Sequence, residues 1–262
     1  MLWENLRADE FEKAVRTSEK TCIIPMGVIE KHGIHLPLGT DVMIARKVSK
    51  MVSEIEPTVI FPYYYFGQIN EAKHVPGTLA YSPKLLMEIL EETCDEIHRN
   101  GFEKIVLANV HGGNPSFINF FMQCTLFEKK DYAVYFVSAY PDDEEQKEAL
   151  KLMNTNDNGG HAGNCETSLI LAYDKNLVKM NAVEEGSEQN MRSIEEGISS
   201  PIWWYDQHPT HYSGPHNSAT VEVGTMLYGI VSRRIAKQIR SIKEDNNVLE
   251  KQKEFFNSKY FK

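Results

Sequence analysis

The sequence lacks several features that would assign it to a class at once. No stretch approaches the roughly 18 apolar residues that a membrane helix needs. The first six residues have neither the basic segment nor the apolar core of a secretory signal. Only four cysteines occur, with no CxxC pair, and each lies in or beside an apolar run. We therefore expect buried free thiols, a cytoplasmic location and no membrane partner.

Positive charge is also scarce. The chain has 28 Lys and Arg against 37 Asp and Glu, a net charge of −9. This balance argues against a nucleic-acid partner, because phosphate binding needs a basic face. We find no internal repeat, low-complexity tract or domain boundary, and 262 residues can bury a sizeable core. A single domain spanning residues 1–262 is the expectation.

Apolar periodicity predicts strands and helices in alternation along most of the chain. The expected strands cover residues 21–29, 58–66, 104–109 and 132–138. The expected helices cover residues 41–55, 82–100, 115–129, 143–153, 165–173 and 219–243. This order predicts an α/β protein with three layers, α/β/α, around a largely parallel sheet. The long irregular region 175–215 is expected at a pocket rim or a subunit interface.

Polar residues with metal-binding side chains follow the first predicted strand. The stretch 30–41 contains Glu30, His32, His35 and Asp41 among glycines and a proline that stiffen it. Mixed carboxylate and imidazole donors suit zinc and similar divalent ions. Open α/β sheets build their sites just past the carboxyl ends of strands. A polar loop that merely contains histidines is the alternative for this stretch taken alone.

Two further clusters have the same architecture. His111 follows the predicted strand 104–109 and precedes two glycines, which leave room for a metal or a substrate. Glu166 heads an otherwise apolar helix shortly after His161. A carboxylate there is costly unless it is paired or binds a metal. The alternatives are a glycine-rich turn with an exposed histidine, and a carboxylate that favours a helix N-terminus.

Other histidines give weaker signals. His74 and the segment 214–220 are expected in loops at the same rim. His208, His211 and His216 fit neither a helix face nor a strand face. We therefore expect them to be surface or substrate-pocket histidines rather than a further metal site.

Four segments in order resemble the creatininase family of metal-dependent amidohydrolases. They are E-x-H-G-x-H-L-P-x-x-T-D at 30–41, N-x-H-G-G-N at 109–114, H-A-G-x-x-E-T-S at 161–168 and a Gly-Pro segment with Ala-Thr at 214–220. The similarity runs from about residue 20 to about residue 240. It implies the creatininase-like α/β/α fold and a homo-oligomer, with a hexamer as the expected state.

The resemblance implies two divalent metal ions per subunit. Glu30 and His111 would bind one ion, His32 and Glu166 would bind the other, and Asp41 would bridge them. Zinc, manganese and iron(II) all suit this donor set. The implied reaction is attack of a metal-activated water on a carbon–nitrogen amide bond.

The resemblance implies that His161 is catalytic, transferring a proton to the leaving nitrogen. His74, Gly113 and Tyr140 are the expected substrate contacts. Gly113 stands where creatinine-hydrolysing members carry a carboxylate, and Tyr140 and Asp157 stand where they carry tryptophans. Creatinine is therefore not the expected substrate.

The leading hypothesis is an amidohydrolase that acts on a small non-peptide or cyclic amide, with formamides among the candidates. One alternative is a two-metal phosphoesterase, because paired metals serve that reaction too. The scarcity of arginine near the motifs weakens it. Another alternative is a non-catalytic metal-binding homologue, which would have no reason to keep all five donors.

Overall fold

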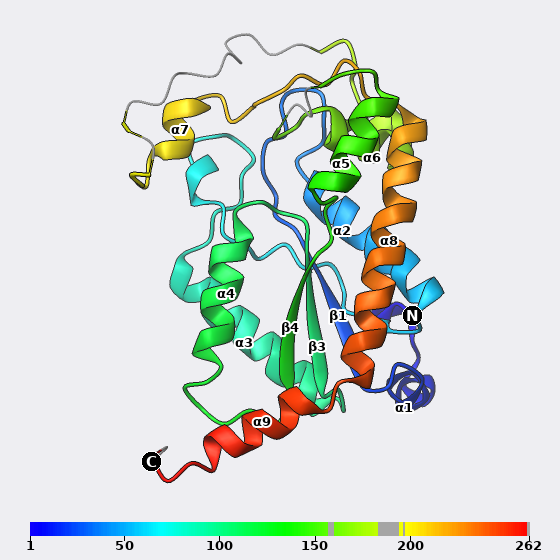
Figure 1. Cartoon of the computed structure of the whole chain (residues 1–262), viewed down its shortest axis with the longest axis vertical. Helices are drawn as coiled ribbons and strands as arrows, with labels where there is room; N and C mark the ends of the chain where they lie inside the picture. Colours follow the sequence, from blue (N-terminus) through cyan, green and yellow to red (C-terminus); the bar gives the residue numbers. More distant parts are fainter. Residues whose placement is uncertain (157–159, 183–193, 196, 261–262) are drawn as a thin grey trace.

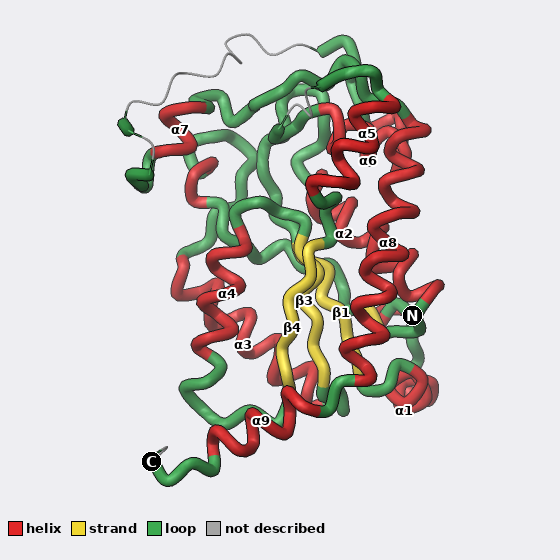
Figure 2. The backbone as a smooth tube through the Cα atoms, viewed as in Figure 1, coloured by secondary structure: helices red, strands yellow, loops and turns green. Residues whose placement is uncertain are grey.

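The computed structural model describes residues 1–156, 160–182, 194–195 and 197–260. Four parallel strands form its sheet in the order β2-β1-β3-β4 (Figures 1 and 2). The strands are β1 (Thr21–Met26), β2 (Val59–Ile60), β3 (Lys104–Asn109) and β4 (Ala133–Ser138). The predicted α/β class and the parallel sheet are confirmed.

Alternate residues along the strands point into two separate apolar cores. Ile23 and Val106 belong to one core, while their neighbours Cys22 and Ile105 belong to the other. Because successive strand residues face opposite sides, this alternation places one core on each face of the sheet. Helices cover both faces, which is the three-layer arrangement expected from the sequence (Figure 1).

Different helices contribute to each core. The first core contains residues of α2 (Thr40–Ile55), α5 (Asp143–Leu152), α6 (Asn164–Asp174) and α8 (Val221–Glu244). The second contains residues of α1 (Ala8–Thr17), α3 (Pro83–Arg99) and α4 (Asn114–Cys124). The short 3₁₀ segments are η1 (Trp3–Asn5), η2 (Asn70–Ala72) and η3 (Lys175–Leu177). None of the helices within the described residues is long and apolar enough to cross a membrane.

The predicted strand 58–66 is wrong in extent, since β2 ends at Ile60. Pro62 follows almost at once, and proline lacks the N–H that a sheet ladder needs. The chain rejoins the sheet edge only at Tyr64, which forms an isolated bridge with Met26. The charged tail contains a helix that the periodicity did not predict, α9 (Asn247–Phe256), which buries Phe256.

The irregular region 175–215 holds little regular structure where it is described. It contains η3 and α7 (Trp203–Gln207), a helix of five residues. Figure 1 shows α7 at the end of the molecule toward which the strands point, above α4.

The close approach of β1 to α2 prepares the site. A Cβ atom at Gly27 would lie 2.6 Å from the main-chain carbon of Asp41. Only glycine avoids this clash. The end of β1 therefore lies directly against the first turn of α2.

Candidate metal centre

Five side chains meet beyond the carboxyl ends of β1 and β3, which are neighbours in the sheet. Glu30 and His32 lie on the loop after β1, and His111 follows β3. Asp41 and Glu166 lie in the first turns of α2 and α6. All five are buried. The parallel sheet thus brings together donors that are up to 136 residues apart in the sequence.

One group of possible ligands contains Glu30, Asp41 and His111, whose donor atoms all lie within 4.8 Å of one another. Nδ1 of His111 is 2.8 Å from Oε1 of Glu30 and 3.1 Å from Oδ2 of Asp41. A single cation could contact all three atoms.

A second group contains His32, Asp41 and Glu166, again within 4.8 Å. Nε2 of His32 is 3.2 Å from Oδ1 of Asp41 and 3.9 Å from Oε2 of Glu166. Asp41 therefore belongs to both groups and presents a different oxygen to each. The family resemblance implied the same two sets of residues around Asp41, and their role as metal ligands is proposed below.

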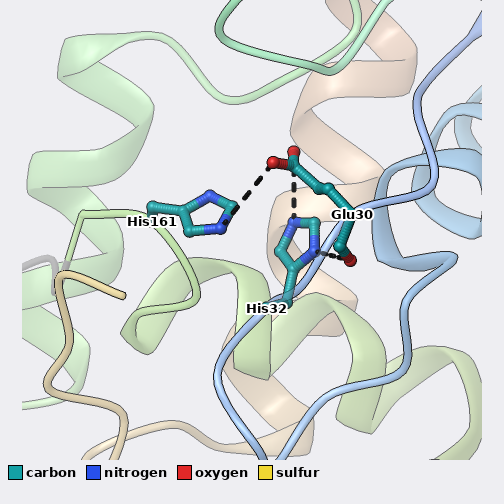
Figure 3. A group of neighbouring side chains, drawn as sticks. All are labelled: Glu30, His32 and His161. Carbon is teal, nitrogen blue, oxygen red and sulfur yellow. Dashed lines mark hydrogen bonds and ion pairs between the residues drawn. The ribbon is translucent and has the colours of Figure 1, made fainter. Parts of the chain in front are cut away.

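A third group contains Glu30, His32 and His161 (Figure 3). His161 lies on the loop before α6, with its Nε2 4.0 Å from Oε2 of Glu30. The same nitrogen is 2.8 Å from the carbonyl oxygen of Lys31, so its N–H donates there. This hydrogen bond holds the imidazole at the edge of the cluster.

Two carboxylate oxygens in the cluster fit the presence of cations. Oε1 of Glu30 and Oδ2 of Asp41 are buried and accept no hydrogen bond from the described residues, although both lie at ion-pair distance from His111. Buried carboxylate oxygens are costly unless a hydrogen bond or a metal ion satisfies them. The donor set, three carboxylates and two or more imidazoles, is one that zinc, manganese and iron accept.

The charges in the cluster are strongly coupled. Burial opposes the charged form of His32, but Asp41, and then Glu166 and Glu30, raise its pKa to about 10. Burial likewise opposes charge on His111, yet Glu30 and Asp41 raise its pKa well above the usual value. Burial raises the pKa of Glu166 to about 7. Without metal, protons on the imidazoles therefore balance the carboxylates.

Hydrogen bonds outside the cluster orient His111. Its Nε2 lies 2.9 Å from the carbonyl oxygen of Gln68, which leaves Nδ1 facing the carboxylates. Asn114 accepts a hydrogen bond from the Gln68 N–H and donates to Asn109, whose amide donates to the His111 carbonyl. The two asparagines of the second motif thus fix the loop that carries His111. Such outer contacts set which nitrogen a metal meets.

His211 is a contact that the sequence did not reveal. We expected a surface or substrate-pocket histidine, and His211 does line the cavity described below. Its side chain is only 2% exposed, however, and its Nε2 is 2.6 Å from Oε2 of Glu30. His216 stacks on His35 with ring centroids 3.7 Å apart, and His208 packs against Trp204. No spacing rule could place His211 beside Glu30, because 181 residues separate them.

A cavity of about 320 Å³ opens over the cluster. It is lined by Glu30, Asp41, Glu71, Val110, His111, Gly112, Gly113, Tyr140, Gln146, Gly160, His161, Glu166, Trp203, Trp204 and His211. Of the expected substrate contacts, Gly113 and Tyr140 lie here. Burial raises the pKa of Tyr140 well above its usual value, so the phenol stays protonated and can donate.

His74 does not reach this cavity. It is exposed, its Nε2 is 3.0 Å from the Pro209 carbonyl oxygen, and it lines a neighbouring cavity of about 740 Å³. The two cavities share Glu71, Gly112, Gly113 and Trp203 as lining residues. They therefore meet along one wall.

Two expectations about the wall change with the structure. Trp203 and Trp204 of α7 line the cavity over the cluster. Flat aromatic surfaces are therefore present, although position 140 holds a tyrosine rather than a tryptophan. Asp157 lies outside the described residues. Gly113 itself has no carboxylate. However, Oε1 of Glu71 lies 2.7 Å from the point that a Cβ atom at position 113 would occupy. The four motifs did not point to Glu71, which lies in η2, or to Trp204, which lies in α7.

Comparison with known proteins identifies the family to which this fold and this buried cluster belong. A family model described as creatinine amidohydrolase matches residues 4–239, and the chain belongs to this creatininase family. The resemblance found in the motifs is confirmed.

Particular relatives can be named. The chain is 27% identical to a creatinine amidohydrolase of Pseudomonas putida over 187 residues, which are 66% of this chain and 72% of that protein. It is 29% identical to a mycofactocin precursor peptide peptidase of Mycolicibacterium smegmatis over 155 residues, 57% of this chain and 56% of that one. It is 29% identical to a 3-dehydro-scyllo-inosose hydrolase of Thermotoga maritima over 104 residues, 38% and 33% of the two chains.

Solved structures have the same fold. One described as creatininase Mn superposes with a TM-score of 0.79 at 23% identity, covering 93% of this chain and 99% of that one. A creatininase variant of Zn-Zn type gives a TM-score of 0.78 at 23% identity, covering 93% and 98%. The three-layer fold is therefore that of creatininase.

Proposed function

We propose that this protein is a metal-dependent amidohydrolase that cleaves a carbon–nitrogen amide bond with two divalent ions, zinc, manganese or iron. Glu30 and His111 would hold one ion, and His32 and Glu166 the other. The observation that carries the proposal is the position of Asp41, whose two carboxylate oxygens each face one of two separate ligand groups.

When bound, such a pair of ions makes water nucleophilic near neutral pH and polarises a carbonyl group. The chain's own residues would do the rest. Tyr140 can donate its O–H to the substrate, and Trp203 and Trp204 offer apolar surface that limits water in the cavity.

His161 is proposed to move the proton. Burial lowers the pKa of His161 to about 3, so its imidazole is neutral at neutral pH. A neutral imidazole must first accept the proton that the attacking water loses before it can deliver one to the departing nitrogen. The hydrogen bond from Nε2 to the Lys31 carbonyl keeps the ring in place during this transfer.

The cavity favours amides over phosphoesters. No Arg or Lys occurs among its lining residues in the described part of the chain. Enzymes that transfer phosphoryl groups commonly clamp the phosphate oxygens with such cations. We therefore rank the phosphoesterase below the amidohydrolase.

The substrate is proposed to be a non-peptide or cyclic amide, with formamides among the candidates, whose reacting carbonyl fits the 320 Å³ cavity. The adjoining cavity gives room for the remainder of a larger substrate. Similar chains are named as a creatinine amidohydrolase, a precursor peptide peptidase and an inosose hydrolase. The substrates named for these relatives therefore differ widely.

The test is a panel assay on protein loaded in turn with Zn²⁺, Mn²⁺ and Fe²⁺. Creatinine, cyclic amides, formamides, short peptides and phosphoesters would be offered to each form, with amine or phosphate release as the readout. Turnover of a non-peptide amide that disappears on chelation supports the proposal. Turnover of phosphoesters alone, or of peptides alone, would contradict the proposed activity and support that other activity instead.

We also propose that the chain acts as a single domain and assembles into a homo-oligomer, with a hexamer as the expected state. Ile202, Trp203 and Tyr205 of the irregular region are strongly exposed for apolar residues, and such residues commonly anchor subunit contacts. Light scattering of the purified protein gives the subunit count.

A further inference from the structure

A chain of two hydrogen bonds connects the cavity wall to the carboxylate of Glu30. Nε1 of Trp204 donates to Nδ1 of His211 at 2.7 Å. Nε2 of His211 lies 2.6 Å from Oε2 of Glu30. Trp204 lines the cavity, while Glu30 lies at its base among the possible ligands. The three side chains come from α7, the loop after it and the loop after β1.

The order of donors in this chain is fixed by chemistry. An indole N–H can only donate, so Nδ1 of His211 must be the acceptor. The ring proton therefore resides on Nε2 and is donated to the carboxylate. A hydrogen bond to an ionised oxygen is stronger than a neutral one and holds its geometry more firmly. Both ring nitrogens of His211 are occupied, and His211 belongs to none of the ligand groups found among the described residues.

The backbone of His211 is held in an unfavourable conformation. Its φ is +57°, in the left-handed region that a residue with a side chain seldom adopts. Such a conformation is unfavourable and persists only where the surroundings impose it. In this protein it places the imidazole between Trp204 and Glu30.

The contact decides which oxygen of Glu30 is free. Because Oε2 is bonded to His211, the carboxylate turns Oε1 toward Nδ1 of His111, 2.8 Å away. That Oε1 atom is buried and accepts no hydrogen bond from the described residues. A carboxylate fixed in this way keeps Oε1 available to a cation, while His211 takes one lone pair of Oε2.

We propose that His211 is a positioning residue that orients Glu30 toward one of the two metal ions, and that Trp204 fixes the tautomer in which His211 does so. This inference rests on the metal centre of the proposed function. It assigns the aromatic wall of α7 a role at one ion only, since no contact of His211 with His32 or Glu166 is found in the described part of the chain.

The experiment follows Co²⁺ binding by absorption spectroscopy in the full-length chain. His211→Ala is expected to weaken binding of one Co²⁺ by about 10- to 100-fold and to change its visible bands, while the other ion binds as before. Trp204→Phe, which keeps an aromatic ring but lacks the N–H, is expected to weaken the same ion less. His211→Gln can still accept from the indole and donate to the carboxylate, and is expected to restore most of the affinity.

His208→Ala is the matched control, because it removes another buried imidazole that packs on Trp204. It is expected to leave both Co²⁺ affinities and spectra within twofold of wild type. The inference is overturned if His211→Ala binds both ions normally, or loses both together with a lowered melting temperature. Wild-type protein that takes up no Co²⁺, Zn²⁺ or Mn²⁺ would overturn the proposed function as well.

Discussion

Oδ2 of Asp41 lies 3.1 Å from Nδ1 of His111, although one residue begins helix α2 and the other follows strand β3. The second oxygen of Asp41 lies 3.2 Å from Nε2 of His32. One carboxylate thus joins two groups of possible ligands.

Asp41→Asn removes the negative charge while keeping the shape of the side chain. An amide is a poor bridge between two cations, so we expect fewer than two bound ions and a fall in turnover of at least about 100-fold. Metal analysis and amide hydrolysis measure the two effects. Asp131→Asn, at an exposed position paired with Lys129, should change neither. Full activity and full metal content in Asp41→Asn would refute the bridging assignment.

Two adjacent glycines should respond differently to alanine. A Cβ at Gly113 would lie 2.6 Å from Nε2 of His111 and 2.7 Å from Oε1 of Glu71, whereas a Cβ at Gly112 would meet nothing within 4 Å. Gly113→Ala must displace His111 from the Gln68 carbonyl, so we expect metal affinity to fall by about 10- to 100-fold. Gly112→Ala should keep it. Equal metal affinities for the two variants would show that the His111 contact is unimportant.

Metal binding should release protons. Without metal, Asp41 and its neighbours raise the pKa of His32 to about 10, and the pKa of His111 is also far above its usual value. Both imidazoles must lose a proton to bind a cation. We expect release of about two protons per subunit at neutral pH and tighter binding as pH rises. Calorimetry in buffers of different ionisation enthalpy counts them, and a binding heat independent of buffer would contradict this.

The stacked pair of His35 and His216 should make stability depend on pH. Burial, and then the neighbouring His216, lowers the pKa of His35 from 6.5 to about 4. Between these values the unfolded chain takes up a proton that the folded chain refuses, so the free energy of unfolding falls as pH drops from about 6.5 to 4. Urea unfolding of chelator-treated protein measures the slope. His35→Gln should flatten it, and an unchanged slope in that variant would refute the assignment.

Helix α8 offers a matched pair for its packing against α6. A Cβ at Gly224 would clash with the carbonyl group of Ser168, while one at Gly229 would meet only the flexible end of Arg233 at 3.3 Å. We expect Gly224→Ala to lower the free energy of unfolding by about 1–3 kcal/mol or more. Gly229→Ala should raise it by about 0.5–1 kcal/mol, since alanine favours helices. Chemical denaturation gives both values, and similar stabilities would mean that α6 and α8 can move apart.

The local pattern of the sequence was sufficient for most of the fold. Runs such as Ile23–Ile24 and Ile105–Leu107 indicated buried strands, and helices with one apolar face alternated with them. The prediction failed where local pattern and tertiary context disagree. The aromatic segment after Ile60 favours a strand, yet Pro62 and the sheet edge end it. The charged tail folds into α9, and burial of the Phe256 side chain favours this helix.

The candidate ligands were also visible in the sequence, because each lies in a short motif just past a strand or at a helix start. Glu30, His32 and Asp41 share one motif, so few residues separate them and a parallel sheet can bring them to the other two. Contacts between distant loops are of another kind. Whether His211 meets Glu30 depends on where α7 packs, and no residue near His211 specifies that partner.

The sequence by itself thus determined the layers and the order of elements, since these follow from apolar periodicity. Its short motifs, through the family resemblance, pointed to the five candidate ligands. Tertiary structure alone decided which oxygen of Glu30 faces His111, which aromatic rings wall the cavity and where Glu71 lies. Those features are set by side chains that approach across long stretches of chain, and the packing of the whole molecule fixes such distances.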